Sequence, residues 1–173
     1  MKSLYMGWIL VTALSGCASA ATDSGPTDAQ IAAIVVTANQ VDVDAGKLAA
    51  STSASKDVRS FANLMVADHS AVNRSATELV QKLNVKPQPS QTSSELQAAG
   101  DGNLAKLKLL KGAAFDKAYI DNEVTYHEAV LDALDKTLIP DADNAELKAL
   151  LIKVRPAFVA HLAHAKHLQG QLK

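Results

Sequence analysis

Residues 112–138 read GAAFDKAYIDNEVTYHEAVLDALDKTL and constrain the fold of this chain more than any other segment. At 100° per residue, the apolar side chains fill two adjoining sectors of a helix and the exposed charges take the rest. An apolar arc this wide is typical of a helix packed against two or more neighbours. Three ionisable residues nevertheless project into the arc: Asp116, Glu123 and His127. Because buried ionisable groups need partners, other helices must supply them.

Three further segments carry a comparable apolar stripe, and the sequence marks where two of them begin. Thr27, with Gln30 three residues later, predicts a capping box, and Ser55 predicts an N-cap. The chain is rich in Ala, Leu and Val, with only 8 Gly and 5 Pro in 173 residues, which favours an all-α protein. We expect four long helices, at about 28–53, 56–84, 113–138 and 143–169.

A long connection separates the second and third of these helices. Residues 85–91 (VKPQPSQ) contain two prolines and cannot be helical. We expect short helices at 92–99 and 104–110, separated by a break at Gly100-Asp101-Gly102. Pro140 is expected to end the third helix, and Pro156 to kink the fourth. The sequence therefore predicts one domain, 27–173, a four-helix bundle with short helices in its long connection.

The first residues resemble an export signal. Residues 4–14 are apolar but too short to span a bilayer comfortably, and they follow the basic Lys2. Leu14-Ser15-Gly16-Cys17 resembles the bacterial lipobox, in which the cysteine is lipidated and becomes the mature N-terminus. The alternative is ordinary cleavage after Ala18-Ser19-Ala20.

We therefore expect a signal peptide at 1–16, lipidation of Cys17 and a flexible tether at 17–26. By resemblance to Gram-negative lipoproteins, the absence of Asp after Cys17 favours an exported, periplasmic protein anchored in the outer membrane. The membrane is thus one expected partner, through the lipidated N-terminus, and an envelope protein is another.

Several classes of function are disfavoured by the sequence. The net charge is −1 with no basic patch, which argues against nucleic acid as a partner. Cys17 is the only cysteine, so the exported domain has no disulfide, thiolate metal site or cysteine nucleophile. No G-x-S-x-G motif or glycine-rich phosphate loop is present, and we assign no catalytic residue.

Each predicted long helix sends polar residues inward. Carboxylates and imidazoles that converge inside a bundle suit zinc, iron or manganese. From the rise per residue, we expect Asp42 and His69 to lie within roughly 4–5 Å along the axis, and likewise Glu123 and His161, but His127 about 10 Å from the level of His161. The inward set is Asp42, Asp68, His69, Asp116, Glu123, His127 and His161.

Two interpretations of this set remain open. A carboxylate beside a histidine in a bundle core is often a hydrogen-bonded polar layer that fixes the register of the helices. The other interpretation is a metal or small-ligand site. A redox-active di-iron centre is disfavoured because its E-x-x-H pairs occur nowhere in the sequence; Glu123 and His127 are four residues apart.

The sequence resembles the bacterial domain-of-unknown-function family 4142, described as predicted exported or outer-membrane proteins with a ferritin-like bundle. The resemblance rests on the segments 38–49 (ANQVDVDAGKLA), 58–69 (VRSFANLMVADH), 112–119 (GAAFDKAY), 124–127 (VTYH) and 156–168 (PAFVAHLAHAKHL). It implies an acid in the first helix, Asp-His in the second and one His in each of the others. Those positions are Asp42, Asp68, His69, His127 and His161. The usual acid of the first helix is Glu, one methylene longer than Asp42.

The function we expect first is a non-catalytic, ferritin-like bundle of the cell envelope that binds a partner or ligand, in a stress-related role. The alternative is a metal-binding bundle with nitrogen ligands from His69, His127 and His161 and oxygen ligands from Asp42 and Glu123. A di-iron oxidase is the third and weakest hypothesis.

Overall fold

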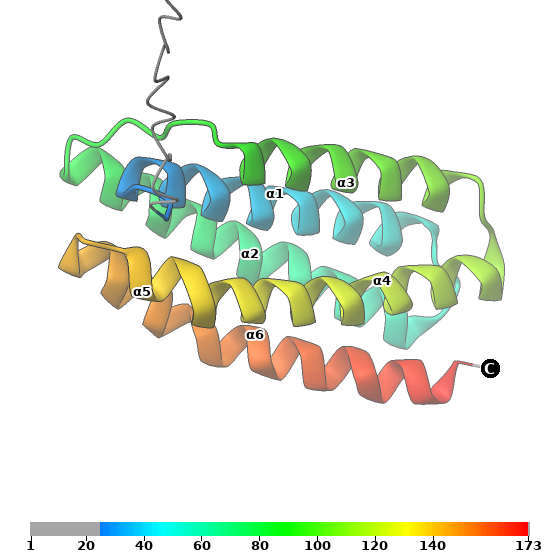
Figure 1. Ribbon diagram of the computed structural model, residues 1–173. Helices are drawn as coiled ribbons and strands as arrows, with labels where there is room; N and C mark the ends of the chain where they lie inside the picture. Colours follow the sequence, from blue (N-terminus) through cyan, green and yellow to red (C-terminus); the bar gives the residue numbers. More distant parts are fainter. Residues whose placement is uncertain (1–24, 173) are drawn as a thin grey trace, which may run out of the picture.

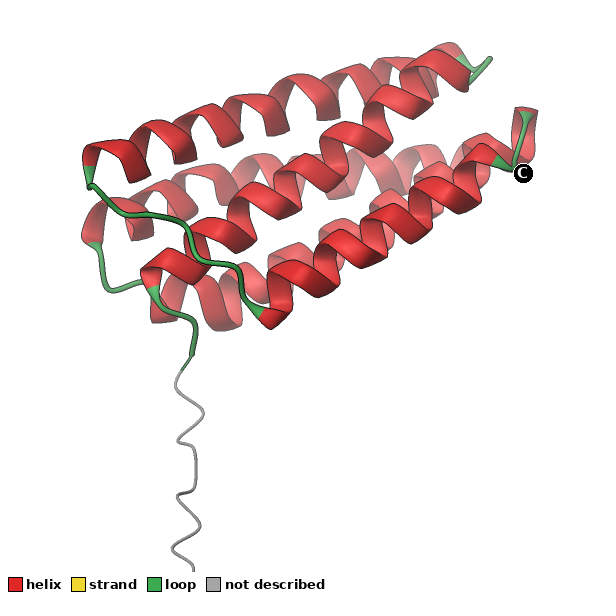
Figure 2. Cartoon of the chain, turned by 90° about the horizontal axis from the view of Figure 1, so that it is seen from above, coloured by secondary structure: helices red, strands yellow, loops and turns green. Residues whose placement is uncertain are grey.

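Five long helices dominate residues 25–172, the part of the chain that the computed structural model describes (Figure 1). No strand occurs among these residues, so the predicted all-α class is confirmed (Figure 2). Helices α1, α2, α4 and α6 pack around a common core, and α3 packs along α1 on its outer side. The elements are α1 (Asp28–Thr52), α2 (Lys56–Lys82), α3 (Gln91–Lys108), α4 (Gly112–Ala133), the π-helix η1 (Leu134–Leu138), α5 (Ile139–Asp141) and α6 (Ala145–Gln171).

The predicted signal peptide at 1–16, the lipidation site Cys17 and most of the predicted tether at 17–26 lie outside the described residues. Among the helices that are described, none is both long and apolar enough to cross a membrane.

Side-chain caps start α1, α2 and α6 close to where the sequence predicts. Thr27 and Gln30 form the expected capping box, and Ser55 accepts a hydrogen bond from the backbone N–H of Val58. Asn144 caps α6. Because helix N-termini leave N–H groups without intrahelical partners, these caps fix the helix starts.

The core consists of two apolar clusters with a polar layer between them, formed by Asp42, His69, Glu123, His127 and His161. One cluster contains Phe61, Phe115 and Tyr119, and the other contains Ile31, Leu134 and Phe158. Along each of α1, α2, α4 and α6, the chain passes from one cluster to the other through the residues of the polar layer. Two apolar cores therefore hold the polar layer in place and exclude water from it.

The expected break in the long connection is wrong, because α3 is one continuous helix from Gln91 to Lys108. Gly100 is buried inside it, where a Cβ atom would lie 2.6 Å from Cγ2 and 2.8 Å from Cγ1 of Val41. The glycine therefore allows α3 to approach α1 closely and does not interrupt the helix. Gly102 has no such neighbour within 4 Å.

This contrast predicts opposite effects of two alanine substitutions in the same helix. Gly102→Ala is expected to stabilise the protein by roughly 0.5–1 kcal/mol, the gain in helix propensity. Gly100→Ala forces Val41 to move, and overpacking is expected to outweigh that gain and destabilise the protein by about 1–2 kcal/mol. Urea unfolding of the two variants measures both values. Equal stabilisation by both would show that the contact with Val41 is not tight.

The third predicted helix also ends later than expected. We expected it to stop near 138, but it continues through η1 and Pro140 to Asp141. The proline ring would clash with the carbonyl of Lys136 in a regular α-helix. The wider π turn of η1, which contains Lys136, relieves this clash, so the helix passes the proline. The predicted fourth helix, α6, also continues through Pro156.

Candidate metal centre

Five predicted site residues meet in the polar layer, and all are at most 3 % exposed: Asp42 from α1, His69 from α2, Glu123 and His127 from α4, and His161 from α6. Potential ligand atoms of His69, His127 and His161 all lie within 4.8 Å of one another. The same holds for Asp42, Glu123 and His127. Because His127 belongs to both groups, the five side chains form one continuous cluster.

The three imidazole rings form a nearly equilateral triangle. Their centroids are 5.5 Å apart for His69 and His127, 5.3 Å for His69 and His161, and 5.5 Å for His127 and His161. Imidazoles that bind one tetrahedral ion at about 2.0–2.1 Å place their ring centroids roughly 5 Å apart. The triangle therefore has the size of a three-histidine metal site.

Each histidine uses one ring nitrogen to hold a partner outside the triangle. His69 donates from Nδ1 to Oδ1 of Asn39 at 2.8 Å. His127 donates from Nδ1 to the backbone carbonyl of Glu123 at 3.0 Å. His161 donates from Nε2 to Oδ2 of Asp68 at 2.9 Å. In the neutral imidazole the second nitrogen then carries a lone pair.

These second nitrogens are buried and have no hydrogen-bond partner among the described residues: Nε2 of His69, Nε2 of His127 and Nδ1 of His161. Histidines that bind metals typically donate their other ring N–H to a carbonyl or carboxylate, which fixes the tautomer and the ring orientation. Asn39, the Glu123 backbone and Asp68 are partners of this kind.

Asp42 lies between the imidazoles. Its Oδ2 is 3.0 Å from Nε2 of His69 and 3.6 Å from Nε2 of His127. Neither contact has the alignment of a hydrogen bond, and both Asp42 oxygens are buried without a hydrogen-bond partner among the described residues. Ligand atoms around one ion at about 2.1 Å lie roughly 3.0–3.4 Å apart. The separation of Asp42 and His69 is within this range, and that of Asp42 and His127 is slightly longer. Glu123 lies on the other side of His127, with Oε2 at 3.5 Å from Nδ1, the nitrogen that faces out of the triangle, and one of its oxygens lies within 4.8 Å of a carboxylate oxygen of Asp42.

Burial and neighbouring charges set the protonation of the cluster. Burial, only partly offset by Asp42, lowers the pKa of His127 to about 4. Burial also lowers the pKa of His161, although its bond to Asp68 opposes this. Both imidazoles are therefore neutral at pH 7, the form that binds metals.

The two carboxyl groups respond in opposite directions. Burial and then the charge of Asp42 raise the pKa of Glu123 well above its ordinary value. Burial also acts to raise the pKa of Asp42, but the attraction of His69, His127 and His161 outweighs it, and the pKa of Asp42 is lowered. The surroundings thus favour the ionised form of Asp42 and the protonated form of Glu123, and a divalent cation between them would favour ionisation of both.

Two of the inward residues predicted from sequence lie outside the cluster. The side chain of Asp68 is 43 % exposed and reaches the cluster only through His161. Asp116, on α4, is buried, but it belongs to neither group of potential ligands.

The expectation that His127 lies about 10 Å from the level of His161 is wrong. It assumed a reversal of the chain near 140–141, whereas α5 ends at Asp141 and α6 begins at Ala145. With the reversal centred near residue 143, the two histidines differ by about two residues, or roughly 3 Å.

Asn39 is the residue that the sequence analysis missed. It is 3 % exposed, and its Nδ2 donates to the carbonyl of Val35 at 2.7 Å, which turns its Oδ1 toward His69. A polar residue three positions before Asp42 on an otherwise apolar face was the available signal. The ring of Phe158 stacks on His69, with centroids 5.0 Å apart and planes inclined by 8°.

One comparison with known proteins gives a match. The family described as "Domain of unknown function (DUF4142)" matches residues 13–168. No curated protein and no solved structure matches the chain significantly. The match includes all five residues of the cluster and covers most of the sequence. This chain therefore belongs to the DUF4142 family.

Proposed function

We propose that this bundle binds one first-row transition-metal ion, zinc, iron or manganese, where α1, α2, α4 and α6 meet. The nitrogen ligands are His69, His127 and His161, and the oxygen ligands are Asp42 and Glu123. The observation that carries the proposal is the set of three inward ring nitrogens that are buried without a hydrogen-bond partner among the described residues. Each belongs to an imidazole whose other nitrogen is held by a partner outside the triangle.

The contacts within the cluster favour an ion over a hydrogen-bonded polar layer. A polar layer satisfies its buried groups by pairing them with one another. Here Asp42 lies at hydrogen-bonding distance from His69, at 3.0 Å, but 3.6 Å from Nε2 of His127, and Nδ1 of His161 has no hydrogen-bond partner among the described residues. An ion would satisfy all of them at once.

The proposed role of the ion is binding or structural rather than catalytic. Two carboxylates and three imidazoles from four helices can saturate a four- or five-coordinate ion, which leaves no open position for a substrate. The absence of E-x-x-H pairs in the sequence also disfavours a di-iron oxidase. From the lipobox-like residues 14–17, we further propose that the bundle is tethered at the cell envelope.

The metal content of the purified protein tests the proposal. The protein, prepared without a histidine tag or chelator, is expected to contain about one ion per chain by mass spectrometry of the elements. His161→Ala removes one ligand and is expected to lower the retained metal at least tenfold. His167→Ala changes an exposed histidine of the same helix and should retain the ion.

Two results would contradict the metal site. One is a protein that stays metal-free after loading with zinc, iron and manganese in turn. The other is equal loss of metal from the two histidine variants, which would indicate binding at the surface.

A further inference from the structure

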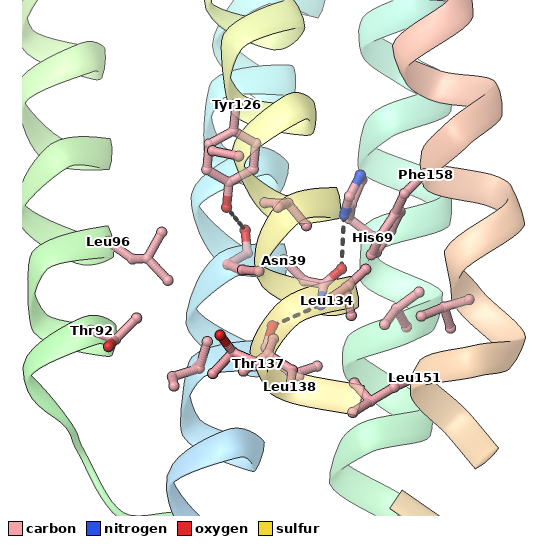
Figure 3. Close-up of a pocket in the computed structure, with 18 of the residues that line it drawn as sticks. Asn39, His69, Thr92, Leu96, Tyr126, Leu134, Thr137, Leu138, Leu151 and Phe158 are labelled. Carbon is pink, nitrogen blue, oxygen red and sulfur yellow. Dashed lines mark hydrogen bonds between the residues drawn. The ribbon is translucent and has the colours of Figure 1, made fainter. Parts of the chain in front are cut away.

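The metal site leaves unused an apolar cavity of about 260 Å³ beside it (Figure 3). It lies between α1, α3, α4 and η1 and extends inward to α2 and α6. Thr92 and Ala129 line it and are exposed, so it opens between α3 and α4. Its inner wall includes Asn39, His69 and Phe158, all buried.

The cavity exists because the helices around it carry small side chains and one widened turn. Ala38, Ala129 and Ala133 line it and leave space between α1 and α4. The π turn of η1 brings Leu134 and Leu138 to its wall. π-Helical turns of this kind are found frequently at functional sites.

The lining defines the chemistry of an occupant. Most of the wall is aliphatic, and the described residues that form it include no Asp, Glu, Lys or Arg. A charged molecule would lose its hydration there without gaining an opposite charge, which is costly. The polar groups on the inner wall are already committed, since Asn39 is bonded to both His69 and Val35. The occupant must therefore be neutral and mainly apolar.

The volume limits the size of the occupant. An engineered aliphatic cavity of about 150 Å³ in another protein binds benzene. A cavity of about 260 Å³ accommodates a larger body, of the order of two fused rings. It is smaller than most drug-binding pockets, which start at roughly 300 Å³.

We propose that this cavity is a binding site for a small, neutral, mainly apolar organic molecule, which packs against the Asn39–His69 pair and the ring of Phe158. This goes beyond the proposed metal function and does not depend on it, because no inward-facing nitrogen or carboxylate of the metal cluster is required. The two sites share only His69, which presents Nδ1 to Asn39 at the cavity and Nε2 to Asp42 in the cluster.

The test uses 2-naphthol as the probe and 2-naphthalenesulfonate as a matched anion, each titrated calorimetrically into the metal-free protein. We expect one 2-naphthol per chain and binding of the sulfonate at least about tenfold weaker, because its charge would be buried without a partner. Ala38→Leu and Ala133→Leu fill the cavity from two different helices. Each is expected to weaken 2-naphthol binding at least about tenfold. Ala163→Leu, at an exposed position of α6, should leave it unchanged.

A measurement without variants covers the case in which both leucine variants misfold. Nuclear Overhauser effects from the naphthol ring are expected at the methyl groups of Leu134 and Leu138. No binding of 2-naphthol, equal binding of the sulfonate, or contacts only to methyl groups outside the cavity would overturn the proposal. Since the protein is metal-free throughout, these outcomes are independent of whether it binds an ion.

Discussion

Loading the metal-free protein with its ion is expected to raise the melting temperature by about 10 °C. An ion at a thousand times its dissociation constant adds about 4 kcal/mol to the free energy of unfolding, if it binds only the folded chain. A chain of this length shifts by roughly 2–4 °C per kcal/mol. The ion is expected to bind only the folded chain because the five proposed ligands come from four different helices. Thermal unfolding followed by circular dichroism, with and without chelator, measures the shift.

Asp42→Asn provides the control for this experiment. The substitution keeps the shape of the side chain but removes the charge that lies between His69 and His127. We expect the ion-dependent shift of the variant to fall from about 10 °C to roughly 3–7 °C, because an affinity lower by about tenfold to a hundredfold leaves about 1.4–2.7 kcal/mol of stabilisation by the ion. A hydrogen-bonded polar layer leads to the opposite expectation. The melting temperature would then be indifferent to chelator and to all three ions.

Helical periodicity predicted most of the polar residues that face inward, although Asn39 was missed. A 100° step assigns each side chain to a face regardless of the neighbouring helices. The positions of Asp42, His69, Glu123, His127 and His161 in the core followed from this, and all five are buried. Asp68 was also predicted to face inward, yet its side chain lies at the boundary with solvent. Whether a residue at the edge of an apolar face is buried or exposed depends on the tilt of the neighbouring helix.

The relative heights of the helices could not be predicted in the same way. They depend on where the chain reverses, and the reversal depends on how a helix accommodates a proline. Pro140 was expected to end the third helix, but a π turn carries the helix past it and brings His127 level with His161. Likewise, the sequence around Gly100 does not show whether this glycine breaks a helix or allows α3 to approach Val41 closely. Tertiary packing decides between these outcomes.

The hydrogen-bond partners that orient His69 and His127 could not be predicted from the sequence either. The N–H groups of His69 and His127 go to an amide oxygen and to a backbone carbonyl, and neither type of residue is diagnostic of a site. Only the three-dimensional arrangement shows that each ring nitrogen on the outer side is occupied and each on the inner side is free. The distinction between a polar layer and a metal site therefore required atomic positions.

Glu123→Gln is expected to stabilise the metal-free protein and to weaken the metal-bound one. The pKa of Glu123 is raised in the folded protein by burial and by Asp42. A raised pKa contributes stability that is fully present below the unfolded value, about 4.5, and is lost as the pH rises through the folded value. Glutamine resembles the protonated acid and does not ionise, so the variant avoids this loss. At pH 8 with chelator, we expect it to be more stable than the wild type by about 1 kcal/mol or more.

The pH series distinguishes this effect from that of His127. The lowered pKa of His127, about 4, makes stability fall as the pH decreases from about 6.5 toward 4. The variant keeps His127, so the difference between wild type and variant reports mainly on Glu123 and should grow as the pH rises above about 4.5. Urea unfolding at pH 5, 6.5 and 8 gives the difference at three points. Glu128→Gln, at an exposed residue of α4 paired with Lys166, should stay within about 0.5 kcal/mol of the wild type at each pH.

With the ion present, the order of stability is expected to reverse. Glu123 then ionises and contributes an oxygen ligand, and a proton is released as the metal binds. Glutamine cannot supply this charge, so the variant should bind the ion at least about tenfold more weakly and gain correspondingly less stability from it. A variant that is less stable than the wild type at pH 8 both with and without the ion would show that Glu123 is ionised in the metal-free core. That result would contradict the protonation assigned to the cluster, because a charged Glu123 beside Asp42 requires a compensating cation from another source.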